Sequence, residues 1–254
     1  MLKPDDPRLQ GSFYGVANAQ WAVGDLSKRE STYRQALEMV ERSRQPDEQI
    51  HLWILNDQAI FAKERKDYKS AVALMRESLR IRERIYPENH PDRIMGVSNL
   101  AEILVLAGER QEARGYLQAA LDSQERTLGP DDWQVASILH SLGELERQEG
   151  QLNRARALLE RSIAIFDKPR NNKNPAGAEI LASLGLVDEA QGRLAEAIDH
   201  YGRAYEIYVS NPSYSARDRA PDYVRVLRNA GRIAEAKRIE SAAMKQPSTN
   251  NPYP

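Results

Sequence analysis

Apolar residues in the segment 97–121 recur with the spacing of two helices separated by a tight turn. The first apolar face contains Val97, Leu100, Ala101, Leu104 and Val105, and the second contains Ala113, Leu117, Ala120 and Leu121. Both faces follow the three- and four-residue steps of a helix. Gly108 lies between them, and glycine most easily adopts the positive φ at which many helices end. The segment therefore predicts an antiparallel helical hairpin, which must stack on other hairpins to bury its apolar faces.

This hairpin pattern repeats along the chain with a period of 42 residues, and four columns of residues keep that register over about six copies. The turn column is Gly24, Lys66, Gly108, Gly150 and Gly192, followed after 39 residues by Gly231; the small residues five positions later are Ala71, Ala113, Ala155, Ala197 and Ala236. The helix-crossing column is Ala17, Ala59, Ala101, Gly143, Gly185 and Val224, and the large apolar column is Leu37, Leu79, Leu121, Ile163, Tyr205 and Met244. Small residues allow two helices to approach closely, and large ones fill the layer between hairpins. The fold class predicted is all-α, an α-solenoid of antiparallel helical hairpins.

Departures from the columns and the segments between copies carry further predictions. Lys66 replaces a turn glycine, so we expect a differently shaped turn there, because a positive φ is uncommon outside glycine. Connections such as 85–92 and 127–134 combine proline with Asp or Asn, which stop one helix and cap the next. The connection 209–222 is the longest and least regular, and we predict a hinge or functional insertion there. Residues 1–8 are expected to be a leader, 9–245 one solenoid, and 246–254 a disordered tail.

Composition and charge narrow the classes of function. The chain has 36 basic and 37 acidic residues, distributed evenly between its two halves, so a basic surface for nucleic acid is not expected. Cysteine is absent, which excludes disulfides and thiolate metal sites. No apolar run reaches the about 18 residues of a membrane helix, and the first residues lack a signal-peptide pattern. We therefore expect a cytoplasmic protein with no membrane span.

The sequence contains no clear constellation for catalysis. None of its four histidines has the spacing of a metal site, and no phosphate-binding loop or nucleophile motif is present. Glu144, Glu146 and Glu149 form an acidic cluster close to Arg147, which we interpret as a solvated helix face. We predict no catalytic residues, no cofactor and no metal.

The small-residue columns, the 42-residue period and the connectors LGPDDW and YPENHP resemble the tetratricopeptide repeat (TPR), and in particular its kinesin light chain-like subtype, over roughly residues 9–245. The resemblance implies a right-handed solenoid that binds proteins or peptides, with the first helix of each hairpin lining a concave groove. Transferred to this chain, the groove positions are Tyr14, Asn18, Trp21, Trp53, Asn56, Ile60, Lys63, Met95, Ser98, Asn99, Glu102, Val105, His140, Ser141, Glu144 and Arg147. The paired Lys and Asn positions that clamp a C-terminal carboxylate in chaperone-binding members are not reproduced, so a free C-terminus is not the expected ligand.

The function expected is a non-enzymatic scaffold that holds a protein or peptide partner in the groove. A peptide-responsive regulatory sensor is the alternative, with the 209–222 connection as its moving part. Trp21 and Trp53 are the favoured anchors, because aromatic residues are enriched among those that contribute most to binding. The other interpretation is that Trp21 closes the first hairpin and that Trp53 packs between the first two copies.

Overall fold

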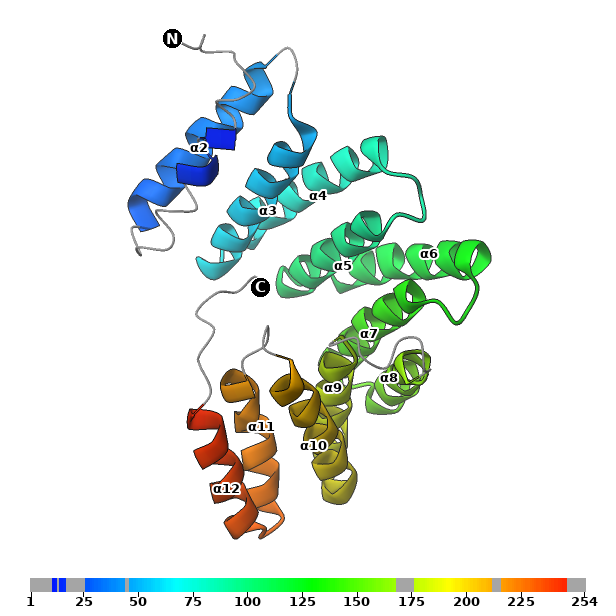
Figure 1. Cartoon of the computed structure of the whole chain (residues 1–254). Helices are drawn as coiled ribbons and strands as arrows, with labels where there is room; N and C mark the ends of the chain where they lie inside the picture. Colours follow the sequence, from blue (N-terminus) through cyan, green and yellow to red (C-terminus); the bar gives the residue numbers. More distant parts are fainter. Residues whose placement is uncertain are drawn as a thin grey trace. The chain divides into compact units, whose positions relative to one another are not determined.

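The computed structural model describes residues 11–12, 14–16, 26–43, 46–167, 176–211 and 216–245. Within these ranges all regular secondary structure is helical (Figure 1). The helices are α2 (Leu26–Arg42), α3 (Glu48–Glu64), α4 (Tyr68–Ile85), α5 (Pro91–Leu106), α6 (Arg110–Leu128), α7 (Trp133–Gln148), α8 (Leu152–Phe166), α9 (Ala176–Ala190), α10 (Leu194–Ser210), α11 (Ala216–Asn229) and α12 (Ile233–Met244). None of the helices in these ranges is both long and apolar enough to cross a membrane.

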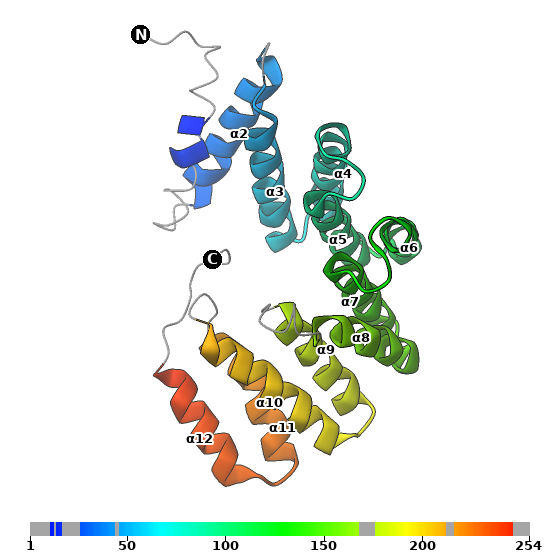
Figure 2. The ribbon, with the colours of Figure 1, turned by 45° about the vertical axis from the view of Figure 1, so that its right-hand side comes forward.

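The chain divides into two compact units, Met1–Ser123 and Gln124–Pro254, with α6 beginning in the first and ending in the second. In the first unit α2 packs on α3, α3 on α4, and α4 on α5. In the second unit α7 packs on α8, α9 on α10 and α11 on α12, and neighbouring hairpins pack through α8 on α9 and α10 on α11 (Figure 2). Consecutive helices from α2 to α5 and from α7 to α12 thus pack on one another, which confirms the predicted all-α solenoid of helical hairpins.

The turns within the hairpins share one backbone geometry. Gly108, Gly150, Gly192 and Gly231 all have φ between 74° and 86°. Around Gly150, its own N–H donates to the Arg147 carbonyl (3.0 Å) and the next N–H donates to the Glu146 carbonyl (2.9 Å). Lys66 makes the same two hydrogen bonds, at 2.9 Å each, and has φ 62°. The prediction of a different turn at Lys66 is wrong, because the packing of α3 on α4 imposes the left-handed conformation on a lysine as well.

The predicted small and large columns account for most of the packing. Ala71, Ala113, Ala155, Ala197 and Ala236 are all completely buried. A Cβ on Gly143 would lie 2.7 Å from Leu159 Cγ, and one on Gly185 would lie 2.8 Å from the Tyr201 ring, so glycine is sterically required at both helix crossings. The large column fails at its last member. Met244 is 67% exposed, because no described helix follows α12 to cover it.

The connections between hairpins are partly as predicted. Asp47 and Asp132 accept hydrogen bonds from backbone N–H groups at the starts of α3 and α7, and His90 does the same for α5. The predicted bounds of the 209–222 connection are wrong, because α10 continues to Ser210 and α11 already begins at Ala216. Pro221 lies inside α11 near its N-terminus, where the missing N–H removes only one helical hydrogen bond, and Ala216 and Ala220 are buried.

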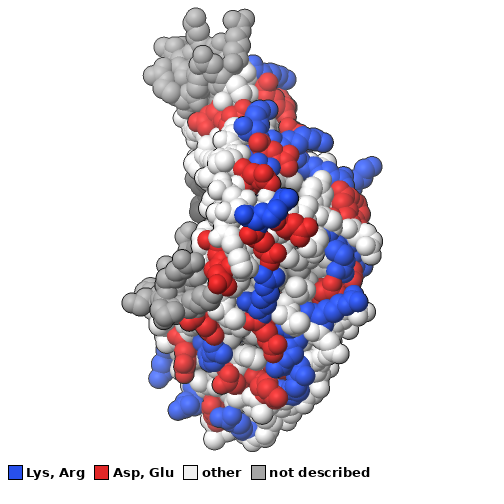
Figure 3. All heavy atoms as spheres, turned by 90° about the vertical axis from the view of Figure 1, so that its right-hand side faces the viewer, with Lys and Arg blue, Asp and Glu red and all other residues white. Residues whose placement is uncertain are grey.

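Charged side chains of both signs alternate over the face shown in Figure 3. Several ion pairs join residues 36 positions apart: Arg84 with Glu48, Arg76 with Glu112, Arg161 with Glu125, and Arg203 with Asp167. Such exposed pairs typically contribute only about 0–1 kcal/mol each. The pairs Arg161–Glu125 and Arg203–Asp167 are one period of 42 residues apart, and each joins one copy to the next.

Several predictions fall on residues outside the described ranges. These are the groove positions Asn18 and Trp21, the column residues Ala17 and Gly24, and the two terminal segments 1–8 and 246–254. For them the sequence-based predictions stand untested.

Candidate functional site

Groove positions of successive copies contact one another through pairs of residues that are 43 positions apart. In the first unit the Tyr14 hydroxyl donates to Asp57 Oδ2 at 3.2 Å, and Asn99 Nδ2 donates to Asn56 Oδ1 at 3.5 Å. In the second unit His140 Nε2 lies 3.0 Å from Ser183 Oγ. Tyr14, Asn56 and His140 occupy the same position of the repeat, so the three contacts are equivalent in place but differ in chemistry. The sequence contains a signal for these contacts, because each partner lies one period of 42 residues plus one residue further along the chain.

Trp53 is more exposed than Tyr14, the other aromatic residue of the predicted groove within the described ranges. It is 45% exposed, although its neighbour Leu52 and the core residue Leu55 are buried. Its ring stacks on that of Tyr14, with centroids 5.5 Å apart and planes inclined by 26°. The Tyr14 hydroxyl is held by Asp57. Trp53 therefore packs on the preceding copy and still presents a large apolar surface, which combines the two interpretations left open by the sequence.

The exposed apolar surface continues one period later at Met95, which is 47% exposed. Trp53 precedes Asn56 by three residues and Met95 precedes Asn99 by four. Each apolar residue therefore lies on the same side of its helix as one amide of the long Asn56–Asn99 hydrogen bond. Lys63 on α3 and Glu102 on α5 form an ion pair of 3.0 Å. Ile60 and Ser98, also predicted for the groove, are half-buried. We call Trp53, Asn56, Met95 and Asn99 the Trp53 face.

The groove positions of the second unit are polar and pair with each other. Glu144 accepts from Arg147 Nε at 3.1 Å and from Nη2 at 2.8 Å. Burial lowers the pKa of His140, although the negative charges of Glu144 and Glu179 act to raise it. The lower pKa favours the neutral imidazole. Burial opposes the charge of Glu144, but hydrogen bonds from Arg147 and Ser183 outweigh it and lower the pKa of this carboxyl. These groups leave little unsatisfied hydrogen-bonding capacity for a ligand.

The interpretation of Glu144, Glu146 and Glu149 as a solvated face is wrong. Glu146 is only 4% exposed, and Glu144 is half-buried in its pair with Arg147. Glu146 occupies the repeat position of Leu104 and Ala62, both of which are buried. The period, rather than the local run of charges, therefore indicates where this carboxylate lies.

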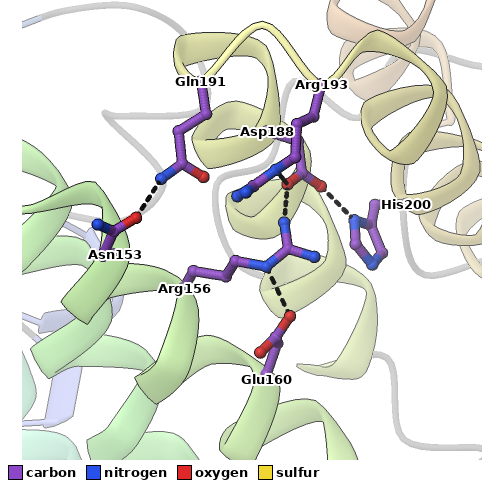
Figure 4. Close-up of polar contacts among 7 residues, drawn as sticks. All are labelled: Asn153, Arg156, Glu160, Asp188, Gln191, Arg193 and His200. Carbon is purple, nitrogen blue, oxygen red and sulfur yellow. Dashed lines mark hydrogen bonds and ion pairs between the residues drawn. The ribbon is translucent and has the colours of Figure 1, made fainter.

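The sequence analysis missed a buried ionic cluster around Asp188, at the same repeat position as Glu146 (Figure 4). The Asp188 carboxylate is completely buried and pairs with Arg156, with Arg193 Nε at 3.2 Å and with His200 Nδ1 at 2.7 Å. A neighbouring hydrogen bond of 2.9 Å joins Gln191 to Asn153. These contacts tie α8 to α9 and α10, and the enclosed carboxylate has no surface for a substrate. We assign the cluster a structural role.

No group of three or more His, Asp or Glu side chains suited to a metal ion occurs in the described ranges. The predicted groove positions present aromatic and amide groups in the first unit and paired charges in the second.

Models of the tetratricopeptide repeat match residues 51–92, 92–168 and 134–209, which together exceed half of the chain. The chain belongs to the tetratricopeptide repeat family. Its TPR solenoid is similar to BtubC (BKLC) from P. vanneervenii, with 25% identity, a TM-score of 0.60, and coverage of 81% of this chain and 83% of that one. No curated protein matches the chain in sequence.

Two further solved structures share the fold. A putative kinesin light chain from Podospora anserina with nearly identical TPR-like repeats has 21% identity and a TM-score of 0.57, covering 76% of this chain and 93% of that one. A Rap protein complexed with Competence and Sporulation Factor has 14% identity and a TM-score of 0.58, covering 92% of this chain and 73% of that one. The TPR repeats of this chain are thus kinesin light chain-like, as the sequence resemblance indicated.

Proposed function

We propose that this TPR protein is a non-enzymatic scaffold that binds a protein or peptide segment, with the Trp53 face as its main contact. The observation that carries the proposal is the half-exposed Trp53 ring, which is held in place by its stack on Tyr14. A large aromatic side chain that is already ordered loses little conformational entropy on binding, and such residues dominate interface energetics. Cytoplasmic location and the absence of a nucleic-acid partner remain predictions from the sequence.

The polar contacts at the groove positions favour the first unit over the second as the place where a ligand binds. The Asn56–Asn99 hydrogen bond of 3.5 Å is at the long limit for such a bond, so a ligand can replace it at little cost. An amide both donates and accepts, as a peptide backbone requires. In the second unit a ligand would have to displace the Glu144–Arg147 ion pair and the His140–Ser183 hydrogen bond.

A peptide-responsive sensor is the second candidate, supported by the similarity to the Rap protein complexed with Competence and Sporulation Factor. The structure shortens the predicted 209–222 connection, because α10 ends at Ser210 and α11 begins at Ala216, and the hinge there remains a prediction from the sequence. Small-angle scattering of the full chain distinguishes the candidates. A sensor changes its radius of gyration when a Trp53-dependent peptide is added, and a static scaffold does not.

The experiment that tests the scaffold is selection of peptides from a random displayed library on the full chain, followed by calorimetric titration. We expect Trp53→Ala to weaken the selected peptides by about 2 kcal/mol, roughly thirtyfold, as at other aromatic hot spots. Met244→Ala is the matched control, because it removes an exposed apolar side chain from the second unit and should leave the affinity unchanged.

The stability of the same variants separates binding from packing. Trp53→Ala should lower the melting temperature less than Leu55→Ala, which opens a cavity in the core. The proposal is wrong when selected peptides bind Trp53→Ala as tightly as the native protein. A loss of stability as large as that of Leu55→Ala would then assign Trp53 to packing alone.

A further inference from the structure

The Trp53 ring is one layer of an unfinished stack. Tyr14 covers one side at 5.5 Å, and 45% of the Trp53 side chain is still exposed. The Asp57 carboxylate supports this stack, because its Oδ2 accepts from the hydroxyls of Tyr14 (3.2 Å) and Tyr33 (2.8 Å). A flat group of a partner can therefore lie on the outer side of Trp53 without reorganising the residues beneath it.

The helices that carry the Trp53 face are acidic, although the chain as a whole is balanced. Helices α3 and α5 contain five acidic residues (Glu48, Asp57, Glu64, Asp92 and Glu102) and two basic ones (Lys63 and Arg93). Helix α4 between them has the opposite composition, with five basic and two acidic residues. Lys63 is engaged by Glu102, Glu48 by Arg84 of α4, and Arg93 lies 4.0 Å from Glu83 of α4. Outside these pairs α3 and α5 contain Asp57, Glu64 and Asp92 but no lysine or arginine, so the two helices favour a partner of positive charge.

Carboxylates also lie close to both exposed apolar residues along the helices. Asp57 follows Trp53 by four residues, and Asp92 precedes Met95 by three, which are the spacings of neighbours on a helix surface. A side chain with an apolar stem and a cationic end would place the stem on Trp53 or Met95 and the charge towards a carboxylate. An acidic side chain would be repelled.

Of the two basic side chains, arginine fits the stack better. Its guanidinium is planar and stacks on aromatic faces, whereas the lysine ammonium carries charge without a plane. The described part of the chain contains this pairing at Arg65, which lies over Phe61 at 5.6 Å, and at Arg219, which lies over Tyr208 at 5.7 Å. We infer that the ligand of the Trp53 face is a basic peptide segment that stacks an arginine on the outer side of Trp53. This inference rests on the proposed function and specifies its ligand.

The test uses the full chain and two blocked pentapeptides, Ala-Ala-Arg-Ala-Ala and its citrulline counterpart, which keeps the planar shape and loses the charge. Calorimetric titration measures the affinity of both peptides for the native protein and for every variant. Nuclear magnetic resonance of the tryptophan indole N–H groups locates binding in the native protein, and Trp53→Phe assigns the Trp53 signal. We expect the arginine peptide to shift that signal and to bind about two- to fivefold tighter than the citrulline peptide, the range of an exposed cation–π contact. Raising the NaCl concentration from about 0.05 to 0.5 M should reduce the difference in affinity between the arginine and citrulline peptides, because salt screens the carboxylates.

Matched variants locate the effect. Trp53→Leu should abolish the preference for arginine, and Trp53→Phe, which keeps an aromatic ring, should reduce it, since tryptophan is the best cation–π partner. Trp133→Phe is the control, because Trp133 is an exposed tryptophan of the second unit and should leave the preference unchanged. Equal affinity of the two peptides overturns the inference, as does a shift confined to the Trp133 signal.

Failure of the inference and failure of the proposed function give different results. Selected library peptides that need Trp53 but bind equally well after arginine is replaced by citrulline leave the scaffold in place and reject the basic ligand. Library peptides that never need Trp53 reject the scaffold proposal. The pentapeptide titration then still reports on arginine stacking, because it is measured at Trp53 itself.

Discussion

At the scale of single residues, the hairpin geometry overrides two ordinary side-chain preferences. Lys66 adopts φ 62°, and it is the only non-glycine residue with positive φ in the ranges that the structure describes. Asp188 is completely buried at a position that holds leucine in other copies, Leu104 and Leu227. Each residue is tolerated because neighbouring groups compensate it: the turn hydrogen bonds for Lys66, and the two arginines with His200 for Asp188.

Lys66→Gly should stabilise the protein by about 0.5–1 kcal/mol. Glycine removes the strain of the left-handed conformation, and this gain exceeds the added entropy of the unfolded chain. Urea unfolding at equilibrium measures the change. Lys237→Gly, at an exposed position inside α12, serves as the control and should destabilise by about 1 kcal/mol. A loss of stability for Lys66→Gly would mean that the turn is not strained.

Acidification should destabilise the fold before carboxylates become protonated in bulk. Burial lowers the pKa values of His140 and His51 below 6.5, so the unfolded chain binds more protons than the folded one as the pH falls through that value. The contribution of these two neutral histidines to the free energy of unfolding is therefore fully present above about pH 7 and decreases towards pH 5. Melting temperatures measured from pH 7 to pH 5 show whether stability falls with pH as expected. The double variant His51→Gln and His140→Gln should show a flatter dependence, and an unchanged slope would contradict the assignment.

At the scale of elements, contact between two helices is set by the size of one residue on each. Gly143 faces Leu159 and Gly185 faces Tyr201, whereas Ala59 and Ala101 occupy the equivalent crossings in the first unit. The crossing residue on the first helix is thus small in each of these four hairpins. Gly108 and Gly150, in contrast, are favoured by the positive φ of their turns, a conformation that Lys66 adopts with strain.

Gly143→Ala should destabilise the protein by about 1–3 kcal/mol, because the new Cβ would lie 2.7 Å from Leu159 Cγ in a packed interface. Gly115→Ala in α6 is the control. No atom lies within 4 Å of its added Cβ, so alanine should stabilise the helix by up to about 1 kcal/mol. Chemical denaturation of both variants provides the comparison. Changes of the same sign would show that helix propensity, rather than the crossing, decides the effect.

At the scale of the whole molecule, the chain forms two compact units, and consecutive helices from α2 to α5 in the first and from α7 to α12 in the second pack on one another. In repeat proteins of this kind, stability is approximately the sum of repeat terms and nearest-neighbour terms. The Asp188 cluster is such a nearest-neighbour term, since it joins α8 to α9 and α10 (Figure 4). Its loss should act locally.

Asp188→Leu should destabilise the second unit by about 3 kcal/mol, although leucine is native at this repeat position elsewhere. The substitution leaves Arg156 and Arg193 without their carboxylate. Hydrogen exchange should show faster opening of α8–α10 and little change in α3–α5. Glu160→Leu removes only the exposed partner of Arg156 and should have a small effect. Uniform loss of protection in both units would contradict a nearest-neighbour role.

The sequence by itself determined the repeat: the hairpins, the glycine turns, the buried alanine column and the Asp132 cap of α7, because these follow from local backbone preferences and from side-chain sizes that recur every 42 residues. The tertiary structure decided the rest. It placed Pro221 inside α11, buried Glu146, gathered the partners of Asp188 and stacked Trp53 on Tyr14. These outcomes depend on which side chains of neighbouring copies meet, and the free energy of a buried charge or a stacked ring is set by those partners and not by its own segment of the chain.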